Sequence, residues 1–145
     1  MPTVTYDSCI HISRQLSSFP KGFCMTVIVL EELTAGSADA SEVKYWGSVR
    51  KSREADGTLF TPNAEDWWIT GKILNSLRRG LKSAKTGKIP KHSASHTERI
   101  IRDTLIARVC KREGLLLVTD NLKDFKTIQD FCPVKVISGK DFFGE

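Results

Sequence analysis

Residues 101–120 read IRDTLIARVCKREGLLLVTD, and this stretch decides the expected fold. Its first half carries apolar residues at helical spacing, which predicts a helix over residues 96–112. Gly114 ends this helix, and residues 115–118 then form a continuous apolar run. A strand that is apolar at every position is typical of the centre of a parallel sheet, where both faces are buried.

The rest of the chain alternates strand-like and helix-like stretches. The strand-like stretches are residues 3–6, 23–26, 58–61 and 134–137, and the helix-like ones are 10–18, 38–55, 63–79 and 122–128. Residues 27–34 fit either a continued strand or a helix. Strands separated by helical crossovers imply a parallel sheet with helices on both faces, so we expect an α/β sandwich.

We expect a single domain over residues 1–145. Residues 82–95 are rich in Lys and Ser, and we expect a basic exposed loop there, because too few residues follow for a second domain. No apolar run approaches the ~18 residues that a membrane span needs, and no signal peptide is recognised. The 4 cysteines form no C-x-x-C pair, which is typical of a reduced cytoplasmic protein.

Charge is unevenly distributed along the chain. The net charge is +5, but residues 67–97 contain no acid and carry +7, which leaves −2 for the other residues. The basic side chains that we consider for contact with an RNA backbone are Arg78, Arg79, Lys82, Lys85, Lys88 and Lys91. Such a segment indicates a polyanion such as RNA or DNA, and it is equally compatible with a solvated helix face and loop.

Acidic residues follow two of the predicted strands. Asp7 comes directly after residues 3–6, and Asp120 comes directly after residues 115–119. In parallel sheets the binding crevice lies outside the carboxyl ends of the strands. If these two strands are neighbours, the two carboxylates therefore lie side by side at the rim of the sheet.

Two further acids are candidates for the same place. Asp103 lies at the edge of the buried stripe of its predicted helix. One of Glu31 and Glu32 must lie near the inward face, because an apolar run precedes the pair and Leu33 follows it. Clustered carboxylates repel one another unless a cation lies between them, and all-oxygen ligands favour Mg²⁺ or Mn²⁺. Such ions are suited to activating water in phosphoryl transfer.

Each acid also has a purely structural interpretation. Asp7 is able to cap the helix that follows it, and Asp120 is able to make a turn. Asp103 is able to pair with an arginine of its own helix, and Glu31 to be an ordinary solvated residue. Taken together, these interpretations leave the clustering of the acids unexplained.

Four acidic blocks follow one another along nearly the whole chain. They read YDS at residues 6–8, VLEELTAG at 29–36, DTLIA at 103–107 and LVTDNLKDF at 117–125. In this order they resemble the PIN-domain family, and in particular its VapC-type toxins. The third and fourth blocks carry most of the resemblance, since the Glu-Leu pair of the second is common in other proteins.

The resemblance implies a three-layer α/β/α sandwich with a central parallel sheet, and a metal-dependent ribonuclease that uses one or two Mg²⁺ or Mn²⁺ ions. The expected catalytic acids are Asp7, Glu32, Asp103, Asp120 and Asp124, of which Asp7, Asp103 and Asp120 are the expected metal ligands. The fourth ligand position stays open among Asp120, Asn121 and Asp124. Residues expected to support these acids by hydrogen bonds are Ser8, Thr119 and Asn121. A homodimer and a cognate antitoxin are also implied.

Three features depart from the family pattern. Cys9 stands where Ser, Thr or Asn is usual, the separation of Asp7 from Glu32 is short, and residues 82–95 look like an insertion. A nucleophilic role for Cys9 is less favoured than that of a buried small residue. Packing roles are favoured over base stacking for Trp46, Trp67 and Trp68. Trp67 or Trp68 is also a candidate for a protein interface, because we do not expect both of these adjacent side chains to point inward.

The sequence therefore favours an Mg²⁺- or Mn²⁺-dependent endoribonuclease, the toxin of a toxin–antitoxin pair. A catalytically weak RNA- or protein-binding module on the same fold is the first alternative. A hydrolase of small phosphate esters is the second.

Overall fold

The structure is a computed structural model that describes residues 3–15, 19–80 and 94–145. Its strands are β1 (Val4–Tyr6), β2 (Met25–Thr26), β3 (Leu59–Phe60), β4 (Leu116–Val118) and β5 (Val136–Ile137). Its helices are α1 (Ser8–Ser13), α2 (Val27–Ala35), α3 (Ala40–Ala55), α4 (Ala64–Gly80), α5 (Ala94–Glu113), α6 (Leu122–Gln129) and α7 (Gly139–Phe143). None of the helices in these ranges has the length and apolar character needed to cross a membrane.

The apolar run at 115–118 forms the central strand of a three-stranded parallel sheet in the order β1-β4-β5. Tyr6 pairs with Val118, and Val118 pairs with Ile137. The strands β2 and β3 form a second parallel pair, and a parallel bridge between Thr5 and Cys24 joins the two sheets. The prediction of a central buried strand is confirmed, since Val118 is fully buried.

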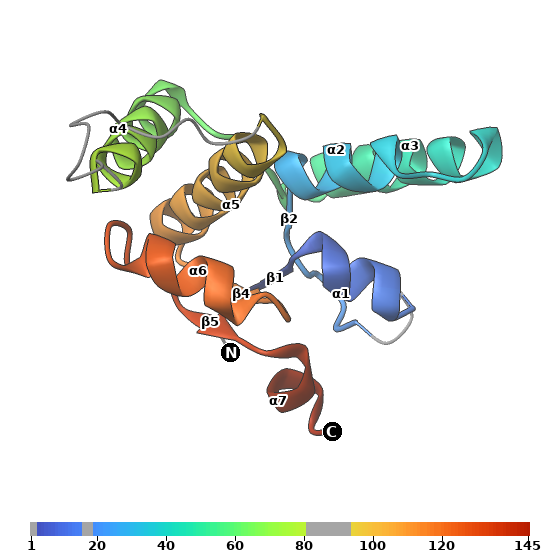
Figure 1. Ribbon diagram of the computed structural model, residues 1–145. Helices are drawn as coiled ribbons and strands as arrows, with labels where there is room; N and C mark the ends of the chain where they lie inside the picture. Colours follow the sequence, from blue (N-terminus) through green and yellow to red (C-terminus); the bar gives the residue numbers. More distant parts are fainter. Residues whose placement is uncertain (1–2, 16–18, 81–93) are drawn as a thin grey trace.

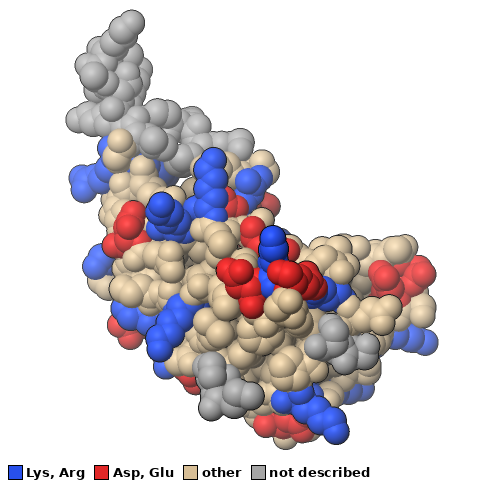
Figure 2. Space-filling view, turned by 90° about the horizontal axis from the view of Figure 1, so that it is seen from below, with Lys and Arg blue, Asp and Glu red and all other residues tan. Residues whose placement is uncertain are grey.

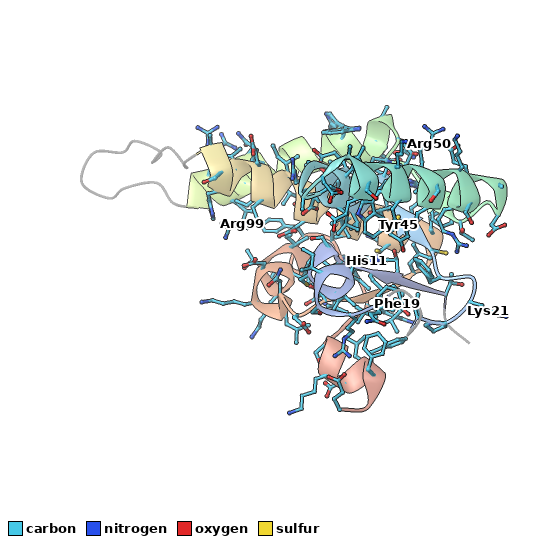
Figure 3. The ribbon with its side chains drawn as sticks, turned by 90° about the vertical axis from the view of Figure 1, so that its right-hand side faces the viewer. His11, Phe19, Lys21, Tyr45, Arg50 and Arg99 are labelled. Carbon is cyan, nitrogen blue, oxygen red and sulfur yellow. The ribbon has the colours of Figure 1, made fainter. Side chains whose placement is uncertain are left out.

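Helices lie on both sides of the strands. In Figures 1 and 3, α2 to α5 lie on one side of the strands and α7 lies on the other. This is the α/β/α arrangement that was expected. The core between the layers includes Ile106, Leu117 and Phe125, all of which are fully buried.

Three elements differ from the sequence-based expectation. The helix expected over 10–18 begins at Ser8 and ends at Ser13, because Arg14 takes an extended backbone (φ −134°, ψ 152°). The ambiguous stretch 27–34 is helical, and the Thr26 hydroxyl caps it by accepting from the Val29 N–H at 3.3 Å. Most of the expected loop 82–95 falls outside the described residues, but Ala94 already belongs to α5.

The short helix α7 was not expected, because five residues are too few to show a periodic pattern. Its residues Phe142 and Phe143 pack against the buried ring of Tyr6, which also stacks on Phe19 with 4.2 Å between ring centroids. Figure 3 shows Phe19 lying between α1 and α7. Aromatic packing thus fixes the carboxyl-terminal helix beneath β1.

Trp67 and Trp68 lie on α4, and 56% and 65% of their surfaces are exposed. Both side chains are thus largely exposed, and Trp67 also lines a groove with residues of α2 and α5. Lys72 lies over the Trp68 ring, with its Nζ 4.5 Å from the centroid.

Candidate active site

Asp7 and Thr119 lie side by side because β1 and β4 are neighbours in register. The Asp7 N–H donates to the Val118 carbonyl at 2.9 Å, which places both residues just beyond the paired strand ends. There the buried Thr119 hydroxyl donates to Asp7 Oδ2 at 2.8 Å. An aspartate that accepts a hydrogen bond from a threonine therefore lies at the carboxyl end of the sheet.

Asp7 is buried, with 3% of its surface exposed. Its Oδ1 accepts from the Ser8 N–H at 2.8 Å, so Asp7 also caps α1. Burial raises the pKa of Asp7, the hydrogen bonds from Thr119, Ser8 and Cys9 lower it, and the charge of Asp124 raises it. The capping role and the place in an acidic group are thus compatible in one residue.

Glu32 is the inner residue of the glutamate pair on α2. The Ser8 hydroxyl donates to Glu32 Oε2 at 3.2 Å, and the pKa of Glu32 is raised by burial and next by the charge of Asp7. Glu31 is exposed and forms an ion pair with Arg102 at 3.3 Å. The two adjacent glutamates therefore face different surroundings.

Asp103, on α5, lies close enough to Asp7 and Glu32 for their charges to act on it. Burial raises its pKa to about 8, and the charges of Asp7, Asp124 and Glu32 contribute in that order. Arg99, one turn earlier on α5, lowers the pKa of Asp103. Asp7, Glu32, Asp103 and Asp124 thus form one group of mutually repelling carboxylates, which we call the acidic cluster.

The two acids that follow Thr119, Asp120 and Asp124, have different surroundings. Asp124 lies in the first turn of α6 and belongs to the acidic cluster through its effect on Asp7 and Asp103. Asp120 instead accepts from the Gly139 N–H at 3.1 Å, at the start of α7. A Cβ on Gly139 would lie 2.9 Å from Asp120 Oδ1, so the absence of a side chain there permits this contact.

Asn121 supports the site through its backbone. Its N–H donates to the Thr119 hydroxyl at 3.0 Å, so that Thr119 accepts from Asn121 while it donates to Asp7. The Asn121 side chain makes no capping hydrogen bond to α6. Of the three predicted supporting residues, Ser8 and Thr119 use their hydroxyls and Asn121 uses its main chain.

Cys9 lies at the edge of the cluster. Its Sγ is 3.9 Å from Asp7 Oδ2 and 3.8 Å from Thr119 Oγ1, and burial raises the pKa of the thiol. A thiol with a raised pKa is a weak nucleophile at neutral pH. Cys9 is a free cysteine, as are Cys24, Cys110 and Cys132.

The donor chemistry of the acidic cluster suits a hard divalent ion, since every side-chain donor is a carboxylate oxygen. Burial is the main cause of the raised pKa values of Asp7, Glu32 and Asp103, and repulsion between the carboxylates adds to it. A cation between these groups would relieve that repulsion. Within residues 3–15, 19–80 and 94–145, however, no three His, Cys, Asp or Glu side chains converge into a preformed metal site. The acidic cluster fits Mg²⁺ or Mn²⁺ by its oxygen ligands and its negative charge, although its carboxylates do not converge on a single metal position.

Only part of the predicted basic segment can be placed. Arg78 and Arg79 are exposed in the last turn of α4, whereas Lys82, Lys85, Lys88 and Lys91 lie outside the described residues. On the face drawn in Figure 2, Lys and Arg side chains are interspersed with Asp and Glu.

A cavity of about 270 Å³ beside the acidic cluster was not foreseen from the sequence. Asp103, Asp124 and Arg99 line it together with residues of α4 and α6. The spacing of Arg99 and Asp103, four residues apart on one helix, was the only sequence feature that pointed to this arginine.

The fold is also found in solved structures. A chain in the crystal structure of DNA-bound VapBC from Salmonella typhimurium matches with a TM-score of 0.53 and 21% sequence identity, over 95% of this chain and 98% of that one. A chain in the structure of FitAB bound to the IR36 DNA fragment matches with a TM-score of 0.53 and 14% identity, over 94% of both chains. No protein-family model and no curated protein sequence matches this chain. The resemblance to VapC-type PIN domains therefore holds for the fold: this chain folds as the matched chains of VapBC and FitAB do.

Proposed function

We propose that this protein is an Mg²⁺- or Mn²⁺-dependent endoribonuclease, the toxin of a toxin–antitoxin pair. The observation that carries the proposal is the acidic cluster at the carboxyl end of the sheet. Burial and mutual repulsion raise the pKa of Asp103 to about 8 and raise those of Asp7 and Glu32. A folded protein that keeps such an unfavourable group is suited to binding a cation.

In this proposal each member of the acidic cluster has a role. Asp7 and Asp103 would hold the ion, and Glu32 and Asp124 would complete the set of ligands. A bound divalent ion lowers the pKa of a water and stabilises negative charge on a phosphate. Thr119 orients Asp7, and Ser8 orients Glu32, so each hydroxyl limits the rotation of one carboxylate. Asp120 was also a candidate ligand, and its hydrogen bond to Gly139 favours Asp124 for the fourth position.

Basic residues would hold the RNA backbone near these carboxylates. Arg78 and Arg79 at the end of α4 and the lysines of residues 82–91 are the candidates. Phosphate contacts of this kind make binding fall steeply with salt concentration. The matched VapBC and FitAB structures contain DNA. We propose by analogy that this chain forms a homodimer and binds an antitoxin protein, as in a toxin–antitoxin pair.

The test is RNA cleavage by the purified chain with Mg²⁺, with Mn²⁺ and with EDTA. We expect cleavage only with a divalent ion, and its loss in Asp7→Asn and Glu32→Gln. Glu31→Gln is the matched control, because it removes the adjacent carboxylate that faces Arg102 instead of the cluster. Equal cleavage by Glu32→Gln and Glu31→Gln would contradict the proposed site.

The toxin role is tested by expression of the chain in a bacterium, followed by sequencing of RNA ends. We expect growth arrest with cuts at discrete positions, and neither in Asp7→Asn. Arrest that persists in Asp7→Asn would rule out RNA hydrolysis by this site as its cause.

A catalytically weak RNA- or protein-binding module is the second candidate. It is favoured by one observation, namely that no preformed metal site is found within the described part of the chain. RNA binding that needs no divalent ion, with no cleavage under any condition, would support this candidate over the nuclease.

A further inference from the structure

The cavity beside the acidic cluster has the volume and the apolar lining of a site for a small group. Its volume is about 270 Å³, and the aliphatic side chains of Leu77, Ile100 and Ile128 line it from α4, α5 and α6. Pockets for drug-sized ligands usually have roughly 300–1,000 Å³, so this one suits a fragment of a larger ligand.

The cavity shares two residues with the proposed catalytic site. Asp103 and Asp124 line the cavity, and both belong to the acidic cluster. A group that enters the cavity is therefore next to the place where the scissile phosphate would lie. In RNA, the flat group with apolar faces that is linked to each phosphate through its ribose is the base.

Polar side chains at the cavity suit the edge of a base. Thr127 and Arg99 both line it, and Figure 3 shows Arg99 on the side of α5 that faces α6. The guanidinium has donors for base edges and phosphates, and its planar face stacks on bases. Its charge also offsets the carboxylate of Asp103, whose pKa it lowers.

We propose that this cavity binds one unpaired base of the RNA substrate next to the phosphate that is cut. The inference rests on the proposed function, and it names the part of the RNA that the cavity would hold. Aliphatic walls clamp the two faces of the base, while Arg99 and Thr127 contact its edge. Unpaired bases that are splayed out of a strand are recognised in proteins by such stacking and edge contacts.

The test fills the cavity and leaves the carboxylates of the acidic cluster unsubstituted. Thr127→Trp places a large side chain at its wall, and Ser76→Trp is the matched control, an exposed hydroxyl residue of α4 that does not line the cavity. Thr127→Phe repeats the test with a smaller ring. Binding of fluorescein-labelled RNA hexamers of uridine, cytidine or adenosine is measured by fluorescence polarisation with Ca²⁺ in place of Mg²⁺. The best-bound hexamer is then remade with one abasic ribose at each position in turn.

In the wild type, we expect one abasic position to weaken binding about ten-fold, as the loss of one stacked base does. In Thr127→Trp, the intact hexamer should bind about ten-fold more weakly, and that abasic position should cause no further loss. Ser76→Trp should behave like the wild type. The proposal is overturned if every abasic position affects both proteins equally, if both tryptophan variants weaken binding alike, or if no hexamer binds.

Cleavage of the same hexamers with Mn²⁺ separates this inference from the proposed function. Position-dependent binding without cleavage in Mn²⁺ supports the base site and contradicts the nuclease. Cleavage that is indifferent to the abasic position and to Thr127→Trp supports the nuclease and contradicts the base site.

Discussion

Two buried aspartates in this molecule have opposite surroundings. Asp66, in the first turn of α4, is fully buried between Arg108 and Arg112, with N–O distances of 3.3 and 3.0 Å. It also accepts from the Asn63 N–H at 3.0 Å. Asp7 is equally hidden, but its neighbours are the Thr119 hydroxyl, the Ser8 N–H and other carboxylates.

The difference separates a structural acid from a site for a ligand. The charge of Asp66 is neutralised by two arginines of α5. The two ion pairs join α4 to α5. Among the described residues, Asp7 accepts hydrogen bonds from the Thr119 hydroxyl and the Ser8 N–H, and its carboxylate neighbours in the acidic cluster add repulsion. Buried charges are usually paired or bind a metal, so Asp7 and its neighbours fit the second case.

The largest effect is expected when the compensated acid is removed. Asp66→Ala should lower the free energy of unfolding by about 3 kcal/mol or more, because it leaves the largely buried guanidinium of Arg108 without its carboxylate partner. Asp103→Asn should leave stability in metal-free buffer unchanged or raised, since it removes repulsion from the acidic cluster. Urea unfolding of both variants measures the difference. A similar loss in both would remove the distinction between the two acids.

The next effect concerns the two acids that follow Thr119. Asp124→Asn should lower the rate of RNA cleavage about 100-fold, which corresponds to about 2.7 kcal/mol of transition-state stabilisation. Asp120→Asn should change the rate less than about three-fold, because Asp120 contacts the Gly139 N–H. Single-turnover cleavage assays give both rates. The reverse order would make Asp120 the fourth acid.

A smaller effect is expected from pH. The pKa of Asp103 is about 8 in the folded protein, against an ordinary value of 3.8, so the folded state holds a proton that the unfolded state has lost. Metal-free stability should therefore fall between pH 5 and pH 8, by on the order of 1–2 kcal/mol after solvent screening. Thermal unfolding across this range measures the slope, and Asp103→Asn should flatten it. Mg²⁺ should raise the melting temperature more at pH 8 than at pH 6, since the ion competes with the proton.

The sequence was most informative where one local pattern decides the structure. The apolar run at 115–118 predicted the central strand, and Asp7 directly after a strand predicted an acid at its carboxyl end. The direction of Asp120 depends on the backbone between β4 and α6 and on Gly139, nineteen residues later, so spacing alone left it open beside Asp124. The cavity could not be predicted from the sequence either, because it forms only when α4, α5 and α6 pack together.

The smallest effect distinguishes the two hydroxyls that hold the acidic cluster. Ser8 donates to Glu32 at 3.2 Å from a half-buried position, whereas Thr119 is fully buried and donates to Asp7 at 2.8 Å. Ser8→Ala should therefore lower the free energy of unfolding by less than about 1 kcal/mol, and Thr119→Val by about 1–2 kcal/mol. Urea unfolding gives both values. Titration with Mg²⁺ should show an affinity for the ion that is about ten-fold lower in Thr119→Val. If Ser8→Ala proved the more damaging change, Glu32 rather than Asp7 would be the carboxylate whose orientation matters most. Glu32, and not Asp7, would then be the acid to compare with Asp66.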